Sequence, residues 1–249
     1  MKRTIAFFMS LIVLSTAVAS AQKLYTKTFK VEDELPNGTG WSYWFIPTGS
    51  VADTLNVKMS CVNKGTASHT PHRHNHDEYF ILLEGEAIIQ LNGEDHVLHA
   101  GDGFLAPGDG AHSLRRVSED IPIRYLMFNR EAKGGVKTPF PFWKENYTAD
   151  DCYAPFQDKK DFWYVSPEMT LNGLNVRSNY LKANKSRKSK ADNRYLVYVI
   201  MEGSADIKTA EETVTLPAMS VCYVPAGTAS SIRATKGTGP VRYLTARIH

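Results

Sequence analysis

In the stretch His72-Arg-His-Asn-His-Asp-Glu-Tyr-Phe-Ile-Leu-Leu-Glu-Gly85, three histidines and a glutamate precede an apolar run. A second stretch, Gly101-Asp-Gly-Phe-Leu-Ala-Pro-Gly-Asp-Gly-Ala-His112, ends on another histidine. Imidazole and carboxylate groups bind divalent transition metals in proteins. Together the two stretches predict one metal site inside a small β-barrel, with four ligands: His72, His74, Glu78 and His112.

The local pattern predicts how these ligands meet. Side chains alternate along a strand, so His72 and His74 are expected on one face. Glu78 keeps that parity if the strand continues, and so does His76. The dipeptide Asn92-Gly93 follows the next apolar run and is the strongest short-range signal for a β-hairpin. His112 is then expected on the strand after Pro107.

These two stretches resemble the two sequence motifs of the cupin superfamily. In the first motif His72, His74, Glu78 and Gly85 stand at the family's spacing, while the leading glycine, Gly65, is one residue out of step. The second motif is matched by Gly101, Pro107 and His112. It departs at Asp109, where the family usually has glycine. This departure lies in a turn and does not affect a ligand. The resemblance implies a jelly-roll barrel that binds one divalent metal ion per chain, which could be Fe, Mn, Ni, Cu or Zn.

The second half of the chain repeats the first at a shift of about 118 to 120 residues. Thus Leu83-Glu-Gly85 recurs as Met201-Glu-Gly203, and Pro122-Ile-Arg-Tyr-Leu126 recurs as Pro240-Val-Arg-Tyr-Leu244. A long period with matching turns indicates two copies of one fold. We therefore predict an all-β chain of two tandem jelly-roll (cupin) β-barrels, a bicupin. The expected boundaries are a signal peptide (1–21), an N-terminal metal-binding barrel (22–130), a linker (131–160) and a C-terminal barrel without metal ligands (161–249).

The same shift shows which copy holds the metal. It places Lys190, Asp192, Leu196 and Ser230 where the first copy has its ligands. Leucine cannot bind a metal, lysine repels one and serine is a poor ligand, so only Asp192 could still coordinate. The C-terminal copy is expected to pack against the first or to form a wall of its cleft. If it binds a ligand, Lys190 and Arg194 favour an anion.

The N-terminus has the pattern of an export signal. Lys2 and Arg3 precede the apolar run 5–19, and Ala19-Ser20-Ala21 supplies small residues for cleavage. We expect a mature chain from Gln22 that is secreted or periplasmic and has no membrane segment after cleavage. Of the 29 basic residues, 27 then remain against 26 acidic ones, a balance that gives no argument for nucleic-acid binding. The basic segment 182–194 is interpreted as a solvated loop, with contact to an anionic polysaccharide as the alternative.

Two kinds of metal chemistry follow from the ligand set. In an oxygenase the metal binds a small-molecule substrate and activates it toward O2, as the resemblance to the quercetin dioxygenase branch implies, and this is slightly favoured. In the alternative the metal acts as a Lewis acid in an isomerase, hydrolase or lyase step on a sugar or uronic acid. Glu78 and His76 are the candidate proton-transfer residues. A non-catalytic carbohydrate-binding cupin is the further alternative, and the resemblance allows a homodimer.

Overall fold

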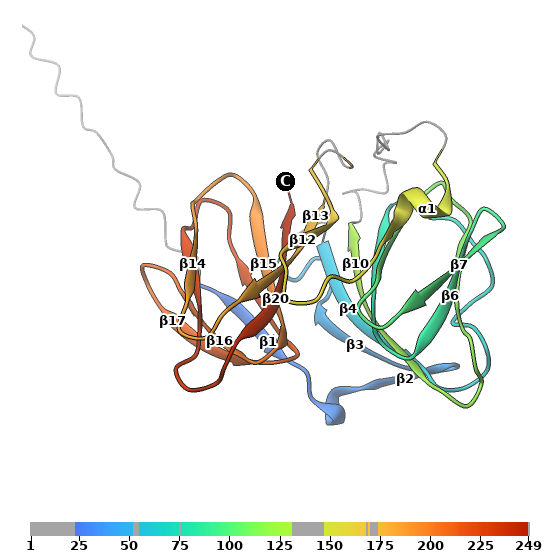
Figure 1. Cartoon of the computed structure of the whole chain (residues 1–249), viewed down its shortest axis with the longest axis horizontal. Helices are drawn as coiled ribbons and strands as arrows, with labels where there is room; N and C mark the ends of the chain where they lie inside the picture. Colours follow the sequence, from blue (N-terminus) through green and yellow to red (C-terminus); the bar gives the residue numbers. More distant parts are fainter. Residues whose placement is uncertain are drawn as a thin grey trace, which may run out of the picture.

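The computed structural model describes residues 23–51, 55–74, 76–130, 147–167, 169 and 174–248. These residues form two β-barrels that lie side by side (Figure 1), each built from a larger and a smaller sheet. The predicted all-β fold with two tandem barrels is thus confirmed. The expected signal peptide, Gln22 and much of the expected linker lie outside the described residues.

The N-terminal barrel has a seven-stranded and a three-stranded sheet, both antiparallel. The larger sheet has the order β11-β8-β5-β10-β4-β3-β2, with bounds Tyr153–Ala154, Gly103–Ala106, Glu78–Glu84, Ile123–Arg130, Leu55–Val62, Gly40–Ile46 and Leu35–Asn37. The smaller sheet has the order β7-β6-β9, with bounds Glu94–His99, Glu86–Leu91 and His112–Arg116. The predicted hairpin at Asn92-Gly93 joins β6 to β7, and both turn residues have positive φ.

The C-terminal barrel has a six-stranded and a four-stranded sheet. The larger sheet has the order β1-β18-β15-β20-β13-β12, with bounds Tyr25–Thr28, Ser220–Val224, Tyr195–Glu202, Val241–Ile248, Asn175–Leu181 and Phe162–Val165. The smaller sheet has the order β14-β19-β16-β17, with bounds Ser186–Ser189, Ser230–Ala234, Ser204–Lys208 and Thr213–Pro217. Helical structure in the described ranges is limited to α1 (Ala149–Cys152) and the 3-10 turn η1 (Val31–Asp33), and neither is long enough to cross a membrane.

The repeated Glu-Gly dipeptide has the same structural role in both barrels. Gly85 has φ +81° and Gly203 has φ +79°, a region that favours glycine. A Cβ atom on Gly85 would lie 2.5 Å from the carbonyl oxygen of Pro122, and one on Gly203 would lie 2.5 Å from that of Pro240. The two halves therefore share one tight turn, packed against the same neighbouring segment.

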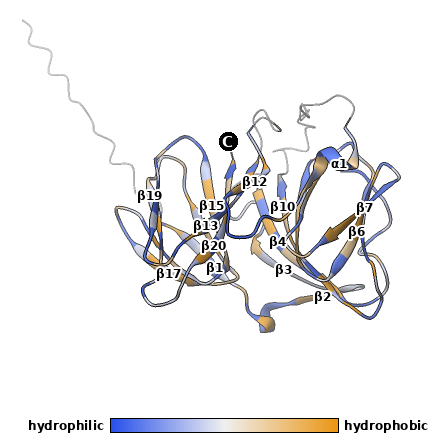
Figure 2. Ribbon diagram, viewed as in Figure 1, coloured by the Kyte–Doolittle hydropathy of each residue, from blue (hydrophilic) through white to orange (hydrophobic). Residues whose placement is uncertain are grey.

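Strand β4 contributes to two different environments because its side chains alternate. Polar residues share the face that points into the N-terminal barrel: Asn56, Lys58 and Ser60. Apolar residues share the opposite face: Leu55, Val57 and Met59. The latter belong to the same buried cluster as Val197 and Val199 of β15. Figure 2 shows such hydrophobic residues along β3, β4 and β15. The sheets of the two barrels thus pack on one another through apolar faces.

The sheet pairing crosses the domain boundaries expected from the sequence at two points. Strand β1 pairs with β18 of the C-terminal barrel, where Tyr25 lies opposite Tyr223. Strand β11 pairs with β8 of the N-terminal barrel, where Tyr153 lies opposite Phe104. Each short strand covers backbone groups that an open sheet edge would expose. Segments of two and four residues carry no periodic signal, so no sequence pattern indicated this exchange.

Candidate metal centre

Backbone contacts between two segments bring the predicted ligands together. His72 forms an isolated bridge to His112 of β9, with backbone N···O distances of 3.1 and 2.9 Å. The backbone N–H of His74 donates to the carbonyl of Gly108 at 3.0 Å. Strand β5 begins only at Glu78. The structure therefore differs from the predicted strand alternation over 72–78, because loop contacts rather than a sheet ladder fix the two histidines.

The ligand atoms lie at spacings that suit one metal ion. The Nε2 atoms of His72 and His74 are 2.8 Å apart. Oε1 of Glu78 lies 3.4 Å from Nε2 of His74, and its Oε2 lies 3.2 Å from Nε2 of His112. A zinc-like ion binds nitrogen and oxygen at about 2.0–2.2 Å, so neighbouring ligand atoms lie roughly 2.8–3.6 Å apart in a tetrahedral or octahedral shell. The ligand atoms of His72, His74 and His112 lie within 4.8 Å of one another, and Glu78 is grouped with His74 and His76; the His/Glu cluster is consistent with a divalent metal site.

Hydrogen bonds on the far side of two rings fix the histidines for coordination. Nδ1 of His112 lies 3.0 Å from the carbonyl oxygen of Gly110, and Nδ1 of His72 lies 3.2 Å from that of Thr70. A carbonyl can only accept, so each Nδ1 carries the proton and each Nε2 keeps its lone pair. Nε2 of His112 then faces a carboxylate oxygen of Glu78. Two acceptor atoms at 3.2 Å need a shared cation, which is either a proton that hydrogen-bonds His112 to the carboxylate or a metal ion in its place.

Glu78 is the anionic centre of the cluster. It is buried, and the amide of Asn129 donates to its Oε1 at 2.9 Å. Burial raises the pKa of Glu78, but hydrogen bonds from His112, His74 and His76 outweigh this and hold the pKa well below its usual range. The carboxylate is therefore ionised wherever the protein is folded at ordinary pH. Asn129 orients it, in the manner of the outer partners that orient metal ligands.

His76 lies behind the ligands rather than at the pocket wall. Its side chain is buried, its ring stacks on His74 at 4.6 Å, and its Nε2 lies 3.7 Å from Oε1 of Glu78. The three residues form a second group whose ligand atoms lie within 4.8 Å of one another. His76 is not among the residues that line the adjacent pocket. Its position therefore suits support of His74 and Glu78 better than the predicted exchange of protons with a substrate.

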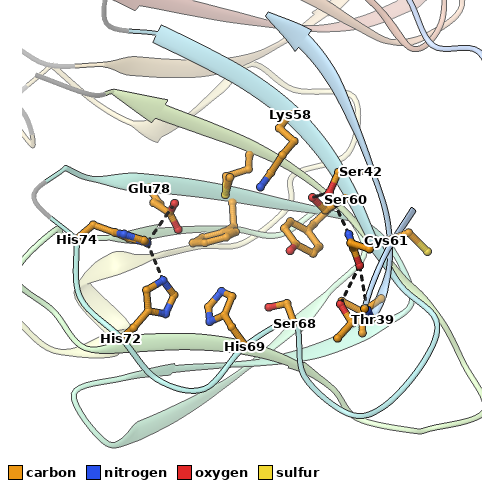
Figure 3. Close-up of a pocket in the computed structure, with 16 residues that line it drawn as sticks. Thr39, Ser42, Lys58, Ser60, Cys61, Ser68, His69, His72, His74 and Glu78 are labelled. Atoms are coloured by element: carbon orange, nitrogen blue, oxygen red, sulfur yellow. Dashed lines mark hydrogen bonds and ion pairs between the residues drawn. The ribbon is translucent and has the colours of Figure 1, made fainter. Parts of the chain in front are cut away.

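A pocket of about 340 Å³ opens from the ligand cluster into the barrel. Figure 3 shows His72, His74 and Glu78 on one side of it, with Lys58 and His69 pointing into the same space. Tyr125 also lines the pocket, and burial raises its pKa to about 12. Burial lowers the pKa of His69 and that of His72. Both imidazoles are thus neutral at ordinary pH, the form that binds a metal or accepts a proton.

Sequence reasoning missed the importance of Lys58 and Asn129. Each is a single polar residue in an apolar strand, and neither belongs to a ligand motif. Asn129 lies directly opposite Glu78 in the β10–β5 register, and Lys58 lies opposite Met127 in the β10–β4 register. The polar alternation on the inward face of β4 was the signal available. Using it requires the cross-strand register, which the sequence alone does not supply.

The corresponding positions of the C-terminal barrel do not form a metal shell. Leu196 is buried, and the hydroxyls of Ser230 and Tyr198 are 2.9 Å apart. Asp192 is bonded to Arg194, with an Nη2···Oδ2 distance of 2.7 Å. Within the described ranges, both groups of candidate metal ligands lie in the N-terminal barrel.

Comparison with known proteins also distinguishes the N-terminal barrel from the C-terminal one. A family model for the cupin domain matches residues 58–129. The curated dimethylsulfoniopropionate lyase DddW of Ruegeria pomeroyi is 34% identical over 55 residues. Those residues make up 22% of this chain and 36% of that protein. The chain therefore aligns with about a third of this relative's length.

Two solved structures match nearly the whole chain. One is a protein of Pseudomonas aeruginosa described as glyoxylate-induced, with a TM-score of 0.73 at 14% identity, covering 93% of this chain and 92% of that one. The other is oxalate decarboxylase of Lactobacillus farciminis with formate, with a TM-score of 0.69 at 13% identity, covering 92% and 87%. At these identities the likeness concerns the fold. Residues 58–129 thus match a cupin domain and contain a His/Glu cluster consistent with a divalent metal site, and the chain as a whole has a bicupin-like fold.

Proposed function

We propose that this protein is a metal-dependent enzyme that converts a small carboxylic acid in the pocket of its N-terminal barrel, through proton transfer without net oxidation. The observation that carries the proposal is the composition of that pocket. The ligand cluster at one side and the amine of Lys58 at another face the same 340 Å³ space. An electrophilic centre and a cation in one small pocket suit a substrate with a carboxylate and a second reacting group.

Lys58 is the proposed carboxylate-binding residue. Its Cα lies roughly 12 Å from that of Glu78, by the strand and residue spacings of the sheet, so a small molecule can reach both ends of the pocket. Its Nζ also lies 5.1 Å from the centre of the Trp44 ring. Burial lowers the pKa of Lys58, whereas the negative charge of Glu78 raises it. A bound carboxylate acts in the same direction as Glu78 and stabilises the ammonium form.

Proton transfer is assigned to His69, with Tyr125 as its partner. The Nδ1 of His69 lies 3.1 Å from the carbonyl oxygen of Thr70, so its Nε2 keeps the lone pair that accepts a proton. Both side chains line the pocket. A neutral phenol such as Tyr125 can donate a hydrogen bond to an oxygen of the substrate. A metal ion held by His72, His74, Glu78 and His112 supplies Lewis acidity toward that substrate.

The lyase relative supports this reaction class. Its name gives dimethylsulfoniopropionate as the substrate, which is a small carboxylate, and lyase chemistry is redox-neutral. The matched part is short, so we propose the substrate class and not that substrate itself. Uronic acids belong to the same class. The expected export signal supports a role for the enzyme outside the cytoplasm.

Oxygenase chemistry is the second candidate. It rests on the ligand set, because three imidazoles and one carboxylate also suit Fe, Mn, Ni and Cu, the metals that react with O2. Two apolar side chains of the pocket, Phe80 and Met127, are compatible with an organic substrate that is not highly polar.

The test is a screen of the metal-reconstituted protein against small carboxylates, with product formation followed by proton NMR and O2 uptake by electrode. The set includes dimethylsulfoniopropionate, oxalate, galacturonate and an unsaturated uronate. Conversion without O2 uptake supports the proposal, and conversion with stoichiometric O2 uptake replaces it with the oxygenase. Saturable binding of a sugar without conversion indicates a carbohydrate-binding protein. The His112→Ala variant is the control for adventitious metal chemistry.

A further inference from the structure

The C-terminal barrel has a partly open cavity of its own, of about 180 Å³. Four of the residues that line it are cationic: Arg177 of β13, Arg187 and Lys188 of β14, and Arg247 of β20. No residue lining it is acidic among those the structure describes. Cations gathered around a cavity repel one another, and an anion bound in the cavity would relieve that repulsion.

The cavity corresponds to the pocket of the N-terminal barrel by sheet register. Arg177 lies opposite Trp163, as Lys58 lies opposite Trp44, and the cation–ring distances are 5.4 and 5.1 Å. Likewise Tyr243 lies opposite Asn179, as Tyr125 lies opposite Ser60. The second barrel has therefore kept an inward-facing cation and tyrosine at the positions where the first barrel has its pocket.

Two carboxylates near the cavity neutralise its arginines only in part. Asp161 accepts from Arg177 at 3.3 Å and from Arg187 at 2.9 Å. Asp192 accepts from Arg194 at 2.7 Å and from Arg247 at 3.1 Å. Four guanidinium groups thus share two carboxylates, whereas Lys188 is exposed on the other face of β14.

Hydrogen bonds hold the arginines in position before any ligand arrives. Nη1 of Arg187 donates to Oδ1 of Asn179 at 2.8 Å, and Nη2 of Arg247 donates to the hydroxyl of Ser189. Nε of Arg177 is buried and has no hydrogen-bond partner within the described ranges. Fixed guanidinium groups bind planar carboxylates with little loss of side-chain entropy.

We propose that the cavity of the C-terminal barrel is a second ligand site, separate from the metal centre, that binds a small carboxylate. The volume suits a molecule of a few carbon atoms and is too small for a polysaccharide segment. The aromatic side chains of Trp163, Tyr198 and Tyr243 in the wall suit the carbon skeleton of such a ligand. The sequence pointed to Lys190 and Arg194 as the anion-binding residues, but the structure places Arg177, Arg187 and Arg247 at the cavity instead.

The fluorescence of Trp163 reports on this site because Arg177 lies over its ring. Malonate and acetate are titrated into the full-length protein at constant ionic strength, and the signal of the Trp163→Phe variant is subtracted. We expect a saturable change for malonate, and an at least tenfold weaker affinity in Arg187→Gln. Lys58→Met, which alters only the N-terminal pocket, is expected to bind malonate at the second site as the wild type does.

Two further measurements distinguish a ligand site from a structural ion-pair network. Arg187→Lys retains the charge beside Asp161 but not the planar fork, so it is expected to fold normally and to lose several-fold in affinity. Inorganic phosphate at equal ionic strength is expected to bind more weakly than malonate. A response that follows ionic strength without saturating, or one unchanged in both Arg187 variants, would overturn the proposal and leave the arginines as a structural ion-pair network. Because the readout is local to Trp163, failure of the metal-dependent reaction does not affect it.

Discussion

The two barrels share their strand arrangement and differ in the side chains that line their interiors. Both have the Glu-Gly turn against a proline carbonyl, both place a cation over a tryptophan, and both bury an apolar sheet face against the other barrel. Only the first has Glu78 and Asn129 facing each other across two strands. At those two register positions the second barrel has Leu196 and Arg247.

That difference shows which positions of the barrel determine chemistry. Outward-facing apolar residues and turn glycines are retained because both barrels need them to fold and pack. The inward-facing polar residues are free to change, and their exchange turns a metal-binding interior into an arginine-lined one. The predictions below test this separation between scaffold and interior.

The largest expected effect is on metal content. His112→Ala removes a ligand whose lone pair faces Glu78, so the metal bound per chain is expected to fall from about one equivalent to near zero. Ser230→Ala alters the corresponding position of the second barrel and is expected to leave the content unchanged. Both values can be measured by elemental analysis after dialysis against a weak chelator. Full metal content in His112→Ala would remove this residue from the shell.

Loss of the hydrogen bond that orients Glu78 is expected to have a smaller effect on metal binding. Asn129→Leu keeps the shape of the side chain but removes the amide that donates to Oε1 of Glu78. We expect metal affinity to weaken by about 10- to 100-fold, the usual effect of losing an outer partner. Competition with a metal-sensing dye measures it. Arg247→Leu, the matched change in the other barrel, is expected to leave the affinity within twofold, and equal losses in both variants would indicate a general loss of stability instead.

The cation of each interior is expected to act only on its own pocket. For a substrate found in the carboxylate screen, Lys58→Met is expected to raise KM by about 10- to 100-fold, from the loss of a charge-assisted hydrogen bond. Arg177→Met is expected to leave that KM unchanged. Steady-state kinetics with metal-saturated protein provides the comparison. An unchanged KM in Lys58→Met would show that the substrate does not depend on this amine.

The smallest difference between the barrels is expected at their shared turn. Gly85→Ala and Gly203→Ala each force a Cβ into a positive-φ position 2.5 Å from a carbonyl oxygen. Each is expected to lower the free energy of unfolding by about 2 to 4 kcal/mol. Urea unfolding of both variants measures the pair, with Gly93→Ala as a control that has positive φ but no close neighbour. A loss confined to one barrel would show that the turns are not equivalent.

Much of the fold could be predicted from the sequence because its signals are local and repeated. Turn glycines, the Asn92-Gly93 hairpin and a period of about 118 residues can all be recognised without knowledge of contacts. The candidate ligands could be proposed for the same reason, since the motif residues are polar at fixed spacings, and the structure brings their side chains into one cluster.

The rest depends on register and on long-range pairing. Lys58 and Asn129 become functional candidates only when β4, β10 and β5 are aligned. The backbone at His76 packs closely against Gly108, where a Cβ would lie 2.7 Å from the carbonyl oxygen of His76. Arg187 lies in a segment interpreted as a solvated loop, yet residues 186–189 form β14 and pair with β19. No pattern within these segments shows which distant strand they meet.

The most direct test of the separation between the two interiors is a crystal structure of the protein grown with Mn2+ and examined by anomalous scattering. We predict one strong peak per chain, within about 2.3 Å of ligand atoms from His72, His74, Glu78 and His112, and no peak in the cavity of the C-terminal barrel. A peak beside Asp192, or none beside Glu78, would contradict the account.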